Sequence, residues 1–185
     1  MKRSHFFAFP LVAVALVAEA GTSRQQRPRK GFKVAKGRGR HIEGLKVLGA
    51  TFDCKVSAKD TDGQLCIFDT IRTAKGGPPL HLHYDQDEWF YVIKGSFKVQ
   101  VGEEIMFLKE GDAAFAPRQV PHTFAKINEG EAQLMVLFQP AGQMEAFFIE
   151  RAALDSETDP VKKQTALNSL WDRHGMKVMG APISF

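Results

Sequence analysis

Residues 81–95 read HLHYDQDEWFYVIKG, and this stretch organises the rest of the chain. Side chains two positions apart on a β-strand share a face, so His81 and His83 point the same way. Glu88 lies beyond a turn at residues 84–87, and a returning strand can bring its carboxylate back beside the two imidazoles. The pattern indicates three ligands of one transition metal ion. The simpler alternative is a pair of histidines on a solvent-exposed strand.

A fourth ligand is available in GDAAFAPRQVPHTF, residues 111–124. Pro117 and Pro121 stiffen the backbone before His122, and a histidine held at such a corner is well placed to bind a metal. The other histidines lie in the N-terminal leader, at the edge of a basic segment and near the end of a predicted helix: His5, His41 and His174. His122 is therefore the best fourth candidate.

Short apolar runs separated by turn residues surround these two stretches. They are ATFDCKV, QLCIFDTI, WFYVIKG, SFKVQV, EEIMFLKEGD, AAFAPR, HTFAKI and AQLMVLFQP. No helical pattern interrupts residues 49–139, and evenly spaced short strands favour an antiparallel barrel or sandwich. We expect one all-β domain at residues 41–140.

The pattern changes after Pro140. GQMEAFFIERAA is compatible with a short helix, and Asp159 followed by Pro160 is typical of a helix start. Apolar residues then follow at helical spacing, and Gly175 ends the pattern. We expect a helical extension at residues 141–185 that packs on the barrel.

The N-terminus has the three parts of a secretory signal peptide. A basic start precedes the apolar run at residues 6–17, and Ala18-Glu19-Ala20 resembles a cleavage site. The run is too short for a membrane span, which needs about 20 residues. We expect a signal peptide at residues 1–20, cleaved near Ala20, and an exported (periplasmic or secreted) protein with no stable membrane anchor. The alternative is an apolar helix packed on the domain.

Charge is divided unevenly along the 185-residue chain. Residues 1–40 have a net charge of +9 and residues 41–185 a net charge of −5, with a total of +4. The basic residues 21–40 predict a flexible linker, or else an arm that touches an anionic surface. Because the folded body is acidic, the overall basicity does not indicate nucleic-acid binding.

The two quoted stretches resemble the paired motifs of the cupin family. Residues 81–95 match H-x-H, four residues, E, six residues and G, which ends at Gly95. Gly111, Pro117 and His122 match the second motif, and fifteen residues separate the two. The chain departs from the pattern where Gln119 replaces a glycine, where Lys126 replaces an asparagine, and in the position of Gly76. The resemblance extends from about Gly44 to Pro140.

The flanks and the HGMKVMGAP ending look most like small single-domain cupins similar to quercetin 2,3-dioxygenase. The resemblance implies a single antiparallel jelly-roll β-barrel. It also implies one divalent ion (Fe, Mn, Ni, Cu or Zn) bound by His81, His83, Glu88 and His122, with Glu88 as catalytic base. The expected function is a dioxygenase that acts with dioxygen on a small enolisable or phenolic, flavonol-like substrate. A non-catalytic metal-dependent binder or sensor, a sugar isomerase or epimerase, and a homodimer stay open.

Several other side chains have an ordinary and a functional interpretation. Trp89, Phe90 and Tyr91 alternate in direction, so at most one side of this trio faces the pocket, and core packing explains each of them. Phe115 and Phe124 line a cavity or fill the barrel. Arg118 orients an acidic substrate or is simply solvated.

Cys54 and Cys66 flank a predicted hairpin turn at residues 57–63. In an oxidising compartment they could face each other and form a disulfide. The alternative is a pair of buried, reduced thiols.

Overall fold

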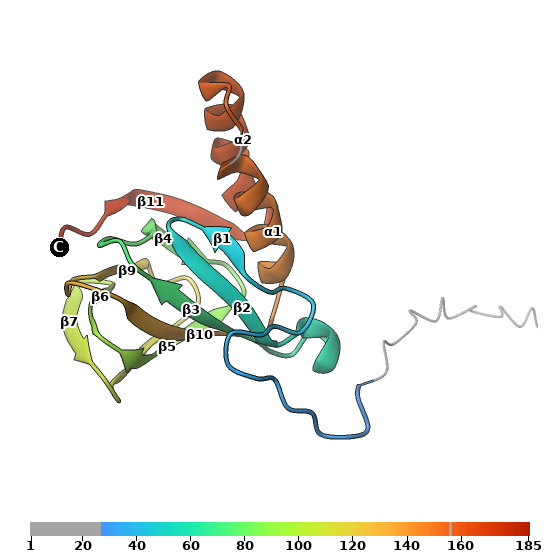
Figure 1. The fold of residues 1–185 in the computed structure, drawn as a ribbon. Coiled ribbons are helices and arrows are strands. Elements are labelled where there is room, and N and C mark those ends of the chain that lie inside the picture. The colour runs from blue at the N-terminus through green and yellow to red at the C-terminus, as the bar shows by residue number, and fades with distance from the viewer. Residues whose placement is uncertain (1–26, 156) are drawn as a thin grey trace, which may run out of the picture.

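The computed structural model describes residues 27–155 and 157–185 (Figure 1). The predicted signal peptide at residues 1–20 lies outside them. The described chain forms two antiparallel sheets and two α-helices. None of the described helices is long and apolar enough to cross a membrane.

The larger sheet has six strands in the order β1-β2-β3-β10-β5-β8. These are Leu45–Val47, Ala50–Val56, Cys66–Arg72, Ala132–Gln139, Asp87–Lys94 and Ala113–Ala116, respectively. The second sheet has five strands in the order β11-β4-β9-β6-β7. These are Met176–Pro182, Pro79–His83, His122–Lys126, Ser96–Val101 and Glu104–Lys109. The predicted all-β jelly-roll fold is confirmed.

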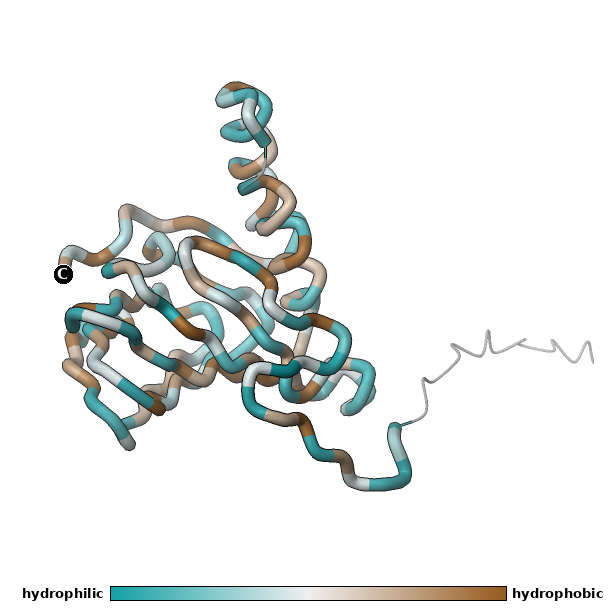
Figure 2. Tube along the Cα trace, viewed as in Figure 1, coloured by the Kyte–Doolittle hydropathy of each residue, from teal (hydrophilic) through white to brown (hydrophobic). Residues whose placement is uncertain are grey.

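The core lies between the inner faces of the two sheets. Strand β10 illustrates why the core lies there. Its buried residues occupy every second position, so they all point to the same face of the sheet. Figure 2 shows hydrophobic residues interspersed with hydrophilic ones along the strands. The largest apolar side chains that are almost completely buried are Phe68, Phe90, Phe97, Leu134 and Phe138. Each such side chain contributes about 1.5–3 kcal/mol of hydrophobic stabilisation, an upper bound.

Two helices, α1 (Met144–Asp155) and α2 (Pro160–Arg173), follow the strands of the larger sheet. The side chain of Asp159 accepts hydrogen bonds from the backbone of Val161 and Lys162, and Pro160 is the first helical residue. This start of α2 is the one that the sequence predicts. The buried residues of α2 are Leu170 and Trp171, so this helix packs through its C-terminal part.

The last strand corrects the expectation that residues 141–185 form a helical extension. After Gly175, whose φ is +74°, the chain returns to the body and forms β11. This strand lies beside β4 (Figure 1) and pairs with it, with Met176 opposite His83. The five-stranded sheet therefore needs residues from beyond the predicted barrel. A short strand that follows two helices forms because a distant strand pairs with it. The local sequence pattern does not reveal that partner.

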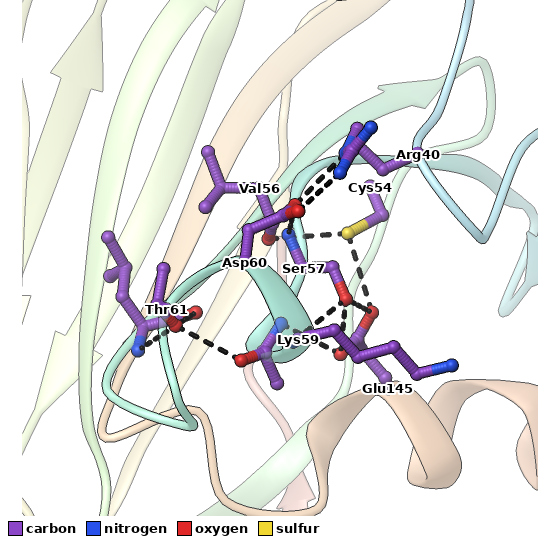
Figure 3. Close-up of polar contacts among 10 residues, drawn as sticks. Arg40, Cys54, Val56, Ser57, Lys59, Asp60, Thr61 and Glu145 are labelled. Atoms are coloured by element: carbon purple, nitrogen blue, oxygen red, sulfur yellow. Dashed lines mark hydrogen bonds and ion pairs between the residues drawn. The ribbon is translucent and has the colours of Figure 1, made fainter. Parts of the chain in front are cut away.

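Glu145 anchors α1 to the hairpin between β2 and β3 (Figure 3). Its carboxylate accepts hydrogen bonds from the Ser57 hydroxyl at 2.9 Å and from the Ala58 backbone N–H at 2.9 Å. Ala58 begins the short 3-10 helix η1 (Ala58–Asp60), so the carboxylate satisfies a free N–H at a helix start. The Sγ of Cys54 lies 3.6 Å from the same carboxylate.

Residues 27–40, the described part of the predicted linker, run beside this hairpin. The guanidinium Nε of Arg40 donates to Asp60 at 3.0 Å, and Arg27 pairs with Asp62 at 3.1 Å. The ammonium of Lys55 donates to the backbone oxygen of Arg38 at 2.6 Å. The described part of this basic segment thus has specific acidic and backbone partners on the domain.

Cys54 and Cys66 are free, buried thiols. The pairing of β2 with β3 places Cys54 opposite Phe68, and an irregularity follows between Cys54 and Val56. The register that would make the two cysteines face each other is therefore wrong, and no disulfide forms. Burial raises the pKa of the Cys54 thiol to about 12, with a further contribution from Glu145.

Candidate metal centre

The four predicted ligands come from three strands. His81 and His83 lie on β4 and His122 on β9, where His81 and His122 are paired residues. Glu88 lies on β5, in the other sheet. The chain after the turn at residues 84–87 does return toward the two histidines, but it does so across the core rather than as a neighbouring strand.

One carboxylate oxygen is the meeting point of the three imidazoles. The Oε2 atom of Glu88 lies 2.8 Å from Nε2 of His122, 3.3 Å from Nε2 of His83 and 4.0 Å from Nε2 of His81. One ligand atom from each of the four residues lies within 4.8 Å of the others, and all four side chains are buried. The fold therefore brings together the complete predicted set.

Two backbone carbonyls orient the imidazoles. The Nδ1 atom of His81 lies 2.8 Å from the carbonyl of Pro79, and that of His122 lies 2.8 Å from the carbonyl of Val120. Because a carbonyl oxygen only accepts, each Nδ1 carries the hydrogen, and each Nε2 is directed toward Glu88. This arrangement is typical of histidines that bind a metal through Nε2.

His83 provides the test of fit for a metal ion. Its exposed fraction is 0%, its Nδ1 has no hydrogen-bond partner among the described residues, and its Nε2 lies 3.3 Å from Oε2 of Glu88 without the geometry of a hydrogen bond. A buried polar atom without a partner is costly in a folded protein. A metal ion bound at Nε2 would satisfy that atom, and three imidazoles with one carboxylate suit first-row transition metals. The residues present therefore fit a metal ion.

Burial controls the protonation of His81. Together with the nearby His122 and His83, it lowers the pKa of His81 to about 3. His81 is thus neutral near pH 7, which is the form that binds metals. For Glu88, burial alone opposes the charged form, but the hydrogen bond from His122 and the nearby His83 outweigh burial and lower its pKa.

The corner before His122 contains the clearest departure from the motif. Gln119 has a φ of +65°, the left-handed conformation that a glycine adopts without strain. Its backbone N–H donates to the carbonyl of His83 at 2.7 Å, and its side-chain amide donates to the carbonyl of Tyr84 at 3.3 Å. The turn therefore keeps the shape of a glycine turn, and these hydrogen bonds tie it to β4.

A small cavity is lined by three of the four ligands, His81, His83 and Glu88. Its volume is about 40 Å³. Its walls are mainly aromatic and aliphatic, and the helices supply Met144, Phe147, Phe148 and Trp171. The indole of Trp171 contacts His81, with ring centroids 4.9 Å apart. The helices α1 and α2 thus cover the site with an apolar surface.

The structure separates the weaker sequence candidates. Phe124 lines the cavity, and Phe90 is buried beside it. Phe115 is 54% exposed and lies away from the cavity, so its interpretation as a lining residue is wrong. Trp89 and Tyr91 stack on each other at the outer face of β5, with ring centroids 5.7 Å apart.

Arg118, for which the sequence left open a role in orienting an acidic substrate or simple solvation, binds Asp87 through a 2.7 Å ion pair at the surface. The arginine in the cavity wall is Arg72, at the end of β3. Sequence reasoning missed it. The signal was present, because Cys66, Phe68, Thr70 and Arg72 occupy alternate positions of one strand, and three inward residues predict that the fourth also points inward.

The fold and the site define an all-β jelly-roll protein with a buried candidate metal centre. Residues 70–139 match the family model described as "Cupin domain", and this part of the chain is a cupin domain. The match contains all four clustered residues and both of the predicted motifs.

Comparison with known proteins gives further similarities. The chain is 40% identical over 55 residues to a Pestalotiopsis fici protein named Oxidoreductase iacF. This match covers 29% of the chain and 27% of that protein, so the chain matches about a quarter of its relative's length.

Among solved structures, the chain is similar to KdgF from Halomonas sp., with 28% identity, a TM-score of 0.43, and coverage of 50% of this chain and 79% of that one. It is also similar to TT1209 from Thermus thermophilus, with 23% identity, a TM-score of 0.47, and coverage of 54% and 91%.

Proposed function

We propose that this protein is a mononuclear-metal dioxygenase that acts on a small enolisable or phenolic substrate. The observation that carries the proposal is the convergence of three buried imidazole nitrogens and one carboxylate beside an apolar cavity. Four protein ligands leave one or two positions open on a five- or six-coordinate ion, and open positions distinguish a catalytic site from a structural one. The oxidoreductase name of the partial relative supports the class of reaction.

A transition metal bound here would supply Lewis acidity and one-electron redox chemistry, which the side chains lack. The four ligands would be His81, His83, Glu88 and His122. The two carbonyls that hold His81 and His122 would keep the ligands oriented without a large change in the protein.

Glu88 is the best candidate for the proton acceptor. Its carboxylate lines the cavity and is charged near pH 7, because its pKa is lowered. In the proposed reaction Glu88 takes the proton from the enol or phenol oxygen of the substrate. The apolar walls, to which Phe124 and Trp171 contribute, exclude water from the activated substrate.

The volume of the cavity limits the size of the substrate. About 40 Å³ corresponds to roughly three water molecules by this measure. A three-ring flavonol does not fit unless α1 and α2 move outward. A compact substrate of a few heavy atoms needs a smaller movement, so the structure favours it over a flavonol.

The second candidate is a non-catalytic, metal-dependent binder of a small molecule. The helical cover favours it, because a ligand held beneath α1 and α2 contacts residues of both helices and can couple binding to their position. Fold alone does not separate a cupin enzyme from a cupin sensor.

Dioxygen uptake distinguishes the two functions. The protein is loaded separately with iron, nickel or manganese, and uptake is measured with small diketones, catechols and flavonols. The dioxygenase proposal is supported if any of these forms takes up dioxygen only when substrate is present and if Glu88→Gln no longer does so. Tight binding without uptake by every form supports the sensor.

We also propose that the chain is exported and loses residues 1–20. Mass spectrometry of the protein from its native host tests this directly. An N-terminus at Gly21 supports export, and an intact Met1 contradicts it.

A further inference from the structure

We propose that Arg72 binds the carboxylate of the substrate, so that the substrate is a small carboxylic acid with a second oxygen donor directed at the metal centre. This inference rests on the proposed function, because both use the same cavity. It names the chemical class of the substrate and assigns a specificity role to a residue outside both cupin motifs.

The position of Arg72 is unusual for a charged residue. It is the last residue of β3, and its side chain is on the inward face with Phe68 and Thr70. Its exposed fraction is 4%, and it lines the cavity together with His81, His83 and Glu88. Its neighbours in the sheet, Ala50 on β2 and Ala132 on β10, are small. The strand thus directs a cation into the core beside the candidate metal centre.

Arg72 has no hydrogen-bonding partner or ion pair within the described residues, and its Nε is buried without one. The other arginines with a buried or half-buried side chain are paired, Arg40 with Asp60 and Arg151 with Asp155. An unpaired buried cation is destabilising unless some other group compensates for the lost solvent. Packing alone does not explain why an unpaired buried cation is present here, and binding of an anionic ligand would explain it.

Two aromatic rings explain how the charge is tolerated. The Cζ atom of Arg72 lies 4.7 Å from the ring centroid of Phe124 and 5.8 Å from that of Phe52. These cation–π contacts stabilise the charge, but an aromatic face supplies no acceptor in the plane of the guanidinium. Burial lowers the pKa of Arg72 only to about 10, so the side chain remains a cation near pH 7.

The one acid in the cavity wall does not pair with Arg72. Glu88 directs its Oε2 atom at His122 and His83, and neither a hydrogen bond nor an ion pair joins it to Arg72, although its negative charge raises the pKa of Arg72. The cavity therefore contains a fork of N–H donors without an acceptor. A carboxylate matches this fork because a guanidinium binds its two oxygens through parallel hydrogen bonds. The small volume also favours a carboxylate over a phosphate ester.

Trp171 offers a direct measure of binding. The chain has two tryptophans, and Trp89 lies outside the cavity. In a Trp89→Phe background, Trp171 fluorescence therefore reports on the cavity. The full chain is loaded with zinc, which has no redox chemistry, so binding is measured without turnover. The probes are pyruvate and its neutral counterpart pyruvamide, with inorganic phosphate as a second anion.

We expect pyruvate to bind more tightly than pyruvamide or phosphate. Arg72→Met should weaken pyruvate binding on the order of 100-fold, as expected for the loss of a buried charge-assisted pair. Arg72→Lys keeps the charge but loses the paired N–H donors of the guanidinium. Its affinity for pyruvate should lie between those of the wild type and Arg72→Met. The matched control is Arg118→Met, which removes a surface arginine and should leave pyruvate binding unchanged.

A structural role predicts a different result. If Arg72 serves only to pack against Phe124, Arg72→Met lowers the urea midpoint and leaves pyruvate binding intact, and the proposal is overturned. We expect the reverse, an equal or higher midpoint with lost binding, because an unpaired buried charge is removed. If Arg72→Met does not fold, the role of Arg72 is tested by the pyruvate affinity of Arg72→Lys and by the difference in affinity between pyruvate and pyruvamide. Equal affinity for these two probes, or tighter binding of phosphate, also overturns the proposal.

Failure of this inference can be separated from failure of the proposed function. Dioxygen uptake with a neutral diketone such as acetylacetone, together with no preference for carboxylates, overturns the role of Arg72 and leaves the dioxygenase standing. Arg72-dependent binding of pyruvate without uptake for any acid, diketone or catechol supports the role of Arg72 and overturns the dioxygenase.

Discussion

The Nε2 atom of His122 lies 2.8 Å from the Oε2 atom of Glu88, within hydrogen-bond distance across the space between the two sheets. His122 belongs to the five-stranded sheet and Glu88 to the six-stranded one. This contact therefore joins the two layers at the candidate metal centre. Burial alone would lower the pKa of His122, but the hydrogen bond with Glu88 outweighs burial and raises it.

We expect His81→Ala and His122→Ala each to abolish stoichiometric metal binding. Each change removes one of the four clustered ligands and one of the two imidazoles held by a backbone carbonyl. The wild-type chain should hold about one ion per chain after brief treatment with a chelator, and each variant close to none. Elemental analysis measures the difference. The matched control is His41→Ala, because His41 is exposed and outside the cluster. Full occupancy in either ligand variant would show that the set of ligands is wrong.

Glu88→Gln should separate metal binding from turnover. The amide keeps the shape and one donor oxygen of the carboxylate, but it loses the charge and the capacity to take a proton. We expect partial retention of metal and a loss of activity on the order of 100-fold or more, the usual contribution of a general base. Metal content and dioxygen uptake are compared on the same samples. Substantial turnover by the variant would exclude Glu88 as the base.

Glu145→Ala should loosen the attachment of α1. The change leaves the Ser57 hydroxyl and the Ala58 N–H without their acceptor, which costs about 1–3 kcal/mol of unfolding free energy. The control on the same helix is Glu150→Ala, whose half-exposed carboxylate pairs with Arg173 at 2.9 Å and lies 3.1 Å from Nε2 of His174, contacts that together contribute about 1 kcal/mol. Urea denaturation compares the two. Equal losses of stability would contradict a specific role for Glu145.

Both cysteines should titrate as free thiols when the chain is denatured without reductant. In the native protein they should react slowly, because both are buried and burial raises the pKa of each thiol. A thiol assay before and after denaturation in guanidinium measures both values. A denatured chain without free thiols would show that a disulfide forms and that the register between β2 and β3 differs.

Local sequence pattern was sufficient to predict much of the candidate site. His81 and His83 share a face because strand side chains alternate, and this depends on nothing outside β4. The start of α2 at Asp159 and Pro160 is likewise local, since capping uses atoms within one turn. The choice of His122 needed only the nearby prolines and the exclusion of the other histidines.

Pairing between distant segments could not be predicted in the same way. The sequence places Glu88 near the histidines but does not reveal that β5 belongs to the opposite sheet. It also leaves β11 unassigned, because a short strand forms only where β4 offers it a free edge. The expected cysteine pair was wrong because strand register depends on the packing of whole faces and on a local irregularity.

The sequence by itself determined which residue types are the ligands, how they are spaced, and that side chains alternate in direction along the strands that carry them. These properties follow from chemistry within a few residues. Only the tertiary structure decided that Arg72 is buried beside the ligands without an acid to pair with, while Arg118 is neutralised by Asp87 at the surface. The two arginines have the same chemistry. Their difference arises from which groups from other strands surround each one, because burial and pairing are properties of the packed chain.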